Sequence, residues 1–191
     1  MSSISAKIAP RIRRHHRERR RKGNVLLEYS FYAMLIAVGL IAVYAIYQTT
    51  QSNSNKVAFI QEITQVQNKI RQTYNGQGSF ANLANAALIN AGGLPRNMIS
   101  GTNLLHSYGG ALTVAPATIA GVANNGFSIT ATNIPAEGCT GLVTQVLGNL
   151  FSVAAGGLTR AQNTTPPPFD PVTAATACAS NSNTIVWTYQ R

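Results

Sequence analysis

Glu28 is the residue of this sequence whose position most needs a chemical explanation. It is the single acidic residue between Asn24 and Tyr47, and it lies five residues past Gly23, where a block of nine lysines and arginines has just ended. An ionised carboxylate well inside an apolar membrane helix costs roughly 2.5 to 3.5 kcal/mol. An unpaired acid there needs a reason, such as a positive charge that pairs with Glu28 in an apolar environment. The alternative is that Glu28 stays hydrated near a membrane surface.

The two cysteines, Cys139 and Cys178, offer a second kind of chemistry. Both follow the apolar segment, and the basic flank in front of that segment places them outside the cytoplasm. In an oxidising compartment such a pair is more often bridged than free. Closing a loop of roughly 40 residues contributes on the order of 4 kcal/mol to stability in the chain-entropy model. Two buried free thiols are the alternative.

Catalysis and metal binding have less support. Past Gly23 the sequence offers four acidic residues and one histidine, His106, so neither a metal site nor a cofactor is predicted. The glycines at 76, 78, 92 and 93 lack the preceding strand and the other residues of a phosphate-binding loop. Asp170 lies among prolines and Glu137 lies close to Cys139, and both are interpreted as surface charges. The sequence predicts a protein that is not an enzyme.

The segment that carries Glu28 is expected to be a membrane helix. Residues 24–47 exceed the roughly 20 apolar residues that cross a bilayer, and the basic flank predicts a cytoplasmic N-terminus and an external C-terminus. An ordinary signal anchor or a cleaved secretory signal would share this topology. A secretory signal has a short apolar core and a small-residue cleavage site, whereas this core is long and leads into residues 48–51, Gln-Thr-Thr-Gln.

The junction at Gly23 resembles the prepilin signal of type IV pilins, in which a glycine precedes an apolar helix with glutamate at its fifth position. The resemblance implies that residues 1–23 are a leader, which prepilin peptidase removes between Gly23 and Asn24, and that the new amino group of Asn24 is methylated. We expect Glu28 to pair with this positively charged amino group in a neighbouring subunit during assembly. The long leader points to the type IVb branch, and residues 94–100 and 103–110 resemble a loop of PilS-type pilins. Asn24 departs from the apolar first residue that the family favours.

The charge distribution supports this division. The leader carries a net charge of +8, and the remaining 168 residues carry +2. Because the basic run lacks interleaved aromatic residues and would be discarded on maturation, no nucleic-acid partner is expected. The remainder has the length of about one domain plus an anchor.

The long helix is predicted to run over residues 24–75. Phe59, Ile63, Val66, Ile70 and Tyr74 recur at spacings of three and four, so this stripe should face a core. Two glycines within residues 75–78 are expected to end the helix. By the resemblance, its first half, residues 24–47, becomes the packed centre of a filament.

Residues 76–191 are predicted to form an α+β head in which a mostly antiparallel sheet lies on the second half of the long helix. Helices are expected over 80–90 and 135–150, and strands over 111–115, 126–134 and 183–190, with residues 124–126 as a hairpin turn. Residues 156–176 are expected to be an exposed loop. The region 139–178, bounded by the cysteines, matches the C-terminal disulfide region of type IVb pilins.

The resemblance implies a structural function. The chain would wait in the inner membrane and then polymerise through bundled N-terminal helices into a surface filament for adhesion, aggregation or conjugation. The implied partners are copies of itself, the prepilin peptidase that also methylates, and an assembly platform with its ATPase. A minor pilin, a type II secretion pseudopilin and a membrane-anchored periplasmic binding module are the alternatives.

Overall fold

The computed structural model describes the backbone of residues 15–145 and 147–191, and the side chains of residues 27–47, 53–145 and 147–191. Most of the expected leader and Val146 lie outside these residues. The chain divides into two compact units, Met1–Thr50 and Gln51–Arg191.

Helix α1 spans His15–Thr73 and contributes to both units. It begins earlier than the predicted residue 24 and ends close to the predicted residue 75, where the Tyr74 N–H still donates to the Ile70 carbonyl at 3.0 Å. The backbone is helical throughout residues 48–56 and at Gly39. The low helix propensity of these positions does not interrupt the helix.

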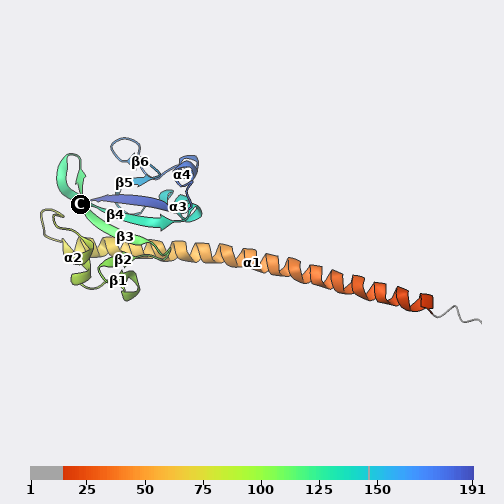
Figure 1. The fold of residues 1–191 in the computed structure, drawn as a ribbon. Coiled ribbons are helices and arrows are strands. Elements are labelled where there is room, and N and C mark those ends of the chain that lie inside the picture. The colour runs from red at the N-terminus through yellow and green to blue at the C-terminus, as the bar shows by residue number, and fades with distance from the viewer. Residues whose placement is uncertain (1–14, 146) are drawn as a thin grey trace, which may run out of the picture. The chain divides into compact units, whose positions relative to one another are not determined.

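Seven strands form one sheet in the second unit, in the order β1-β2-β3-β4-β7-β5-β6 (Figure 1). All neighbouring strands are antiparallel, which confirms the predicted α+β class. The strands are Ile99–Ser100 (β1), Asn103–Leu105 (β2), Ala111–Ile119 (β3), Val122–Ile134 (β4), Leu150–Ala155 (β5), Leu158–Ala161 (β6) and Asn183–Gln190 (β7). The C-terminal strand therefore lies inside the sheet, between β4 and β5.

The β3–β4 hairpin turns at Ala120 and Gly121, so the predicted turn at residues 124–126 was wrong. Both turn residues have positive φ, 51° and 81°, as a two-residue type I′ turn requires. Alanine is a rare choice for such a position, which is why the sequence does not signal this turn. Residues 124–126 lie within β4.

Two short helices differ from their predicted limits. Helix α2 covers only Asn85–Asn90 of the predicted 80–90, and α3 covers Ala136–Val143 of the predicted 135–150. Leu150 instead begins β5. The expected loop over 156–176 was also wrong, because it contains β6 and most of α4, Pro171–Ala177.

The core lies between α1 and one face of the sheet. Phe59, Ile63, Val66 and Ile70 are at most 1% exposed, and Tyr74 packs against the same core, so the predicted stripe is confirmed. Buried residues alternate along β7, where Ile185, Trp187 and Tyr189 face inward. Each fully buried large apolar side chain contributes about 1.5 to 3 kcal/mol. The second half of α1 is thereby fixed to the head.

Candidate assembly surfaces

The first candidate surface is the apolar segment of α1, Leu27–Tyr47. Its 21 residues have a mean hydropathy of 2.0, and none of this segment is buried. Large side chains such as Phe31, Ile41 and Ile46 are 61 to 69% exposed. A continuous apolar surface of this length is suited to lipid or to packing against other apolar helices.

Glu28 lies on this apolar segment, with an exposed side chain. Among the residues whose side chains are described, it has no ion-pair partner. Nearby, the Ser30 hydroxyl donates to the Leu27 carbonyl at 2.8 Å, which satisfies this polar group within the helix. Gly23 and Asn24 are helical in backbone, but their side chains lie outside the described residues. Cleavage, methylation and the pairing of Glu28 stay predictions.

A second set of residues packs the C-terminal half of α1 against the head. Phe59 packs against His106, Tyr108 and Trp187, with ring centroids 5.0, 5.7 and 5.7 Å away. One turn further along, Glu62 accepts hydrogen bonds from the backbone N–H of Ser107 at 2.9 Å and from its hydroxyl at 2.6 Å. The loop between β2 and β3 is thus attached to α1 by both apolar and polar contacts.

His106 is buried at the centre of this loop, with 5% of its surface exposed. Its Nδ1 accepts from the Tyr108 N–H at 3.2 Å, so the ring proton is on Nε2, which donates to the Thr132 carbonyl at 2.9 Å. Burial lowers the pKa of His106, and the bond to Thr132 and the charge of Glu62 offset this only in part. The folded protein therefore holds a neutral imidazole here.

From the sequence, His106 is only a poor candidate for a metal ligand, and Glu62 does not stand out as a site residue. A signal was nevertheless present for Glu62. It lies three residues after Phe59 and four before Val66, so it borders the buried stripe of the helix. An acid in that position is expected to find a hydrogen-bond donor on the packed element.

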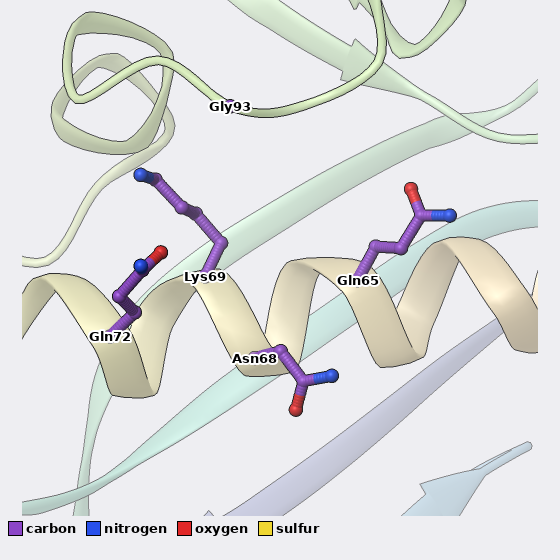
Figure 2. A pocket seen from close by; sticks show the side chains of 5 residues that line it. All are labelled: Gln65, Asn68, Lys69, Gln72 and Gly93. Carbon is purple, nitrogen blue, oxygen red and sulfur yellow. The ribbon is translucent and has the colours of Figure 1, made fainter.

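Polar and basic side chains cover the opposite side of α1. Gln65, Asn68, Lys69, Gln72 and Gly93 line a cavity of ≈ 510 Å³. Figure 2 shows Lys69 extended toward the loop that carries Gly93, whereas Asn68 points away from that loop. The Lys69 ammonium donates to the Ala91 carbonyl at 3.3 Å. Lys69 thus holds the end of α2 close to α1.

The C-terminal region is closed by the Cys139–Cys178 disulfide, as the sequence predicts, with the two Cα atoms 5.7 Å apart. Both cysteines are buried, Cys139 in α3 and Cys178 directly after α4. Helices α3 and α4 lie side by side (Figure 1), and the Phe169 N–H before α4 donates to the Val143 carbonyl of α3 at 3.0 Å. The bridge therefore joins two packed helices.

Asp170 caps α4 and is exposed, as its interpretation as a surface charge requires. It accepts from the Thr173 N–H at 3.0 Å and from the Thr173 hydroxyl at 2.6 Å, and it pairs with Arg160 at 2.6 Å. The hydrogen bonds from Thr173, followed by the charge of Arg160, lower the pKa of this carboxyl. The role of Asp170 in this arrangement is structural.

Solved structures define the class of this fold. The crystal structure of a type IVb pilin from Salmonella typhi is similar with a TM-score of 0.54 at 22% identity, covering 73% of this chain and 99% of that one. TcpA, a type IV pilin from Vibrio cholerae El Tor biotype, is similar with a TM-score of 0.52 at 15% identity, covering 72% and 99%. The chain has the type IV pilin fold.

Sequence comparison gives the family. A family model described as PilS N terminal matches residues 53–190. The major structural subunit of the bundle-forming pilus of Escherichia coli O111:H- is 28% identical over 184 residues, covering 88% of this chain and 93% of the relative. The corresponding subunit of Escherichia coli O127:H6 is 27% identical with the same coverage. The chain belongs to the PilS family and is a type IVb pilin.

Proposed function

We propose that this pilin polymerises with copies of itself into a surface filament of which it is the major subunit. One observation carries the proposal: the 21 residues of Leu27–Tyr47 have no buried side chain, although the second unit has a closed core of its own. The apolar side chains of the segment are therefore left exposed by the folded head and are available to an external apolar partner. The Escherichia coli relatives, described as major structural subunits, support the same role.

Two environments cover the apolar side chains of this segment, one before assembly and one after it. Before assembly it spans the inner membrane with the N-terminus in the cytoplasm, as the basic flank favours. Prepilin peptidase then removes residues 1–23 and methylates the new amino group of Asn24. In the filament, residues 24–47 pack against the same segment of neighbouring subunits, and residues 76–191 form the exposed head. The α1 segment 24–75 connects these two parts.

The filament serves adhesion, aggregation or conjugation, and it needs an assembly platform and an ATPase to extract the subunit from the membrane. The role of the chain itself is structural and not enzymatic. Among the described residues, no group of three histidine, cysteine, aspartate or glutamate side chains is placed to hold a metal ion.

Shearing of cells tests the proposal. The chain is expressed together with its peptidase and assembly proteins, and the sheared surface fraction is compared with the membrane fraction. A major pilin dominates the sheared fraction as filaments seen by electron microscopy. A trace amount in filaments built of another subunit would instead indicate a minor pilin. A short structure confined to the periplasm would indicate a secretion pseudopilin, and complete retention in the membrane would indicate an anchored binding module.

A further inference from the structure

The sequence contains two Asn-Gly pairs, Asn75–Gly76 and Asn125–Gly126, and the structure places them in opposite environments. This dipeptide is chemically reactive, because the backbone nitrogen of the glycine can attack the side-chain amide of the asparagine. Glycine hinders that attack least, since it has no Cβ and adopts a wide range of backbone angles. Local structure then decides which pair reacts.

Asn75 and Gly76 lie on an exposed turn directly after α1. The Gln77 N–H donates to the Tyr74 carbonyl at 3.1 Å, and the φ of 81° at Gly76 fits the third residue of a type II turn. Within the described part of the chain, the N–H of Gly76 has no acceptor. A Cβ at this glycine would meet no atom within 4 Å. The attacking nitrogen thus makes no hydrogen bond, and there is open space beside the Cα atom of its glycine.

Two arginines surround this turn. Arg71 and Arg191 line a cavity of ≈ 170 Å³ together with Asn75 and Gly76. Their guanidinium groups are held by bonds to the Gln190 carbonyl at 3.0 Å and the Gly78 carbonyl at 2.8 Å. Positive charge in fixed positions favours the negative charge that develops on the attacked carbonyl oxygen. It also favours a carboxylate over an amide at residue 75.

Asn125 and Gly126 lie inside β4. Gly126 is buried and pairs with Ala117 of β3 on one side and with Gln190 of β7 on the other. A Cβ at Gly126 would collide with the Ile119 side chain and the Tyr189 carbonyl. For the Gly126 nitrogen to attack the side chain of Asn125, the backbone at this pair would have to rotate. That rotation would require the central strands of the sheet to separate.

We propose that Asn75 is a site of spontaneous deamidation in the folded pilin and that the sheet protects Asn125. The Gly76 nitrogen forms a bond to Cγ of Asn75 and loses its proton to solvent. The Nδ2 nitrogen takes up a proton from solvent, the bond from Cγ to Nδ2 breaks, and ammonia departs to give a succinimide. Water then opens the ring to aspartate or isoaspartate, without any oxidant or reductant. The product places a negative charge beside Arg71 and Arg191.

The test uses the full-length chain in detergent, incubated in mildly alkaline buffer and followed by peptide mass spectrometry. We expect the peptide with Asn75 to convert from amide to acid several times faster than the peptide with Asn125. In urea with reductant, the two sites should convert at similar rates. Equal rates in the folded protein, or an Asn75 that stays amide while the denatured control converts, would overturn the proposal.

Variants test the contribution of the arginines. Arg191→Gln should slow the conversion of Asn75 several-fold, whereas Arg96→Gln, an exposed arginine that does not line this cavity, should leave it unchanged. Asn75→Asp, which imitates one product, should melt at a higher temperature than Asn75→Gln at low salt, and the difference should shrink as salt screens the charges. An unchanged rate in Arg191→Gln would show that this arginine does not promote the attack on Asn75. A difference in melting temperature that does not depend on salt would show that the cavity does not favour the charged product.

Discussion

The carboxylate of Glu62 accepts two hydrogen bonds from Ser107, one from the backbone N–H at 2.9 Å and one from the hydroxyl at 2.6 Å. The two residues are 45 positions apart in the sequence. Glu62 belongs to α1, and Ser107 to the loop that also places His106 and Tyr108 against Phe59. This pair is therefore a polar link between the helix and the β2–β3 side of the sheet.

We expect Glu62→Ala to lower the free energy of unfolding by about 1.5 to 3 kcal/mol, the range for hydrogen bonds to charged groups. Ser107→Ala should cost less, since its backbone N–H keeps its bond. Adding Ser107→Ala to Glu62→Ala should cost almost nothing more. Urea titration of the full chain measures this, followed by the fluorescence of Trp187, which is the single tryptophan and is fully buried.

The matched control for this pair is Gln61→Ala, an exposed neighbour on the same helix, which should change stability by less than about 0.5 kcal/mol. If the two single variants at Glu62 and Ser107 simply added in the double variant, the hydroxyl bond would not contribute as described.

The buried His106 predicts a loss of stability in mild acid. Its pKa is lowered from 6.5 by burial, so the unfolded chain binds a proton at a higher pH than the folded protein does. The stability that depends on neutral His106 is present above pH 6.5 and is lost as the pH falls below that value toward the folded pKa. The urea midpoint should therefore decrease between about pH 7 and pH 5.

His106→Gln identifies the group responsible for this pH dependence. This variant should be less stable at neutral pH, yet its urea midpoint should be flatter over the same interval. The other two histidines, His15 and His16, provide the control, because replacing both with glutamine should keep the slope of the parent. A slope that survives His106→Gln would assign the titration to another group.

The Cys139–Cys178 disulfide should contribute about 4 kcal/mol, because it closes a loop of 39 residues in the unfolded chain. The double variant Cys139→Ala with Cys178→Ala should lose this stability, and the reduced parent should match the variant. Non-reducing electrophoresis and thiol labelling report the state of the cysteines. Labelling of both thiols in the folded, exported protein would contradict the bridge.

The elements that could be predicted from the sequence are those whose local pattern coincides with their packing. The stripe Phe59, Ile63, Val66 and Ile70 repeats with the helical period, and every member is buried. The strand at 183–190 is rich in β-branched and aromatic residues, and it lies in the interior of the sheet. In both cases propensity, periodicity and burial favour the same structure.

The missed elements are short or depend on distant partners. Strands β1 and β2 have only two and three residues, so each exists through its neighbour and not through its own pattern. Helix α4 is not predicted, because the prolines before it favour a loop. Asp170 followed by Pro171 is nevertheless a recognisable helix start, with a capping acid and a proline in the first turn. The Glu62–Ser107 hydrogen bonds could not be predicted from the local sequence, since only the fold brings the two residues together.

Processing at the N-terminus should be visible directly by mass spectrometry. In cells that contain prepilin peptidase, we expect the mature chain to start at Asn24 and to carry one methyl group on its amino group. Gly23→Ala keeps the length and charge of the leader and serves as the cleavage-site variant, which should accumulate with the leader intact. A start beyond Tyr47 would contradict retention of the apolar segment.

The role of Glu28 is tested by separating insertion from assembly. Removing its charge with Glu28→Gln makes the apolar segment easier to insert, because the acid costs roughly 2.5 to 3.5 kcal/mol inside a membrane helix. Membrane levels and leader removal should therefore be at least those of the parent. Filament yield should nevertheless fall strongly, since the amino group of Asn24 in a neighbouring subunit would be left as an unpaired charge inside an apolar bundle.

Ser30→Ala is the matched control, because Ser30 bonds only within its own helix, and this variant should assemble normally. Sheared-filament yield is the deciding measurement. A normal yield from Glu28→Gln would show that Glu28 stays hydrated near the membrane surface and does not pair during assembly.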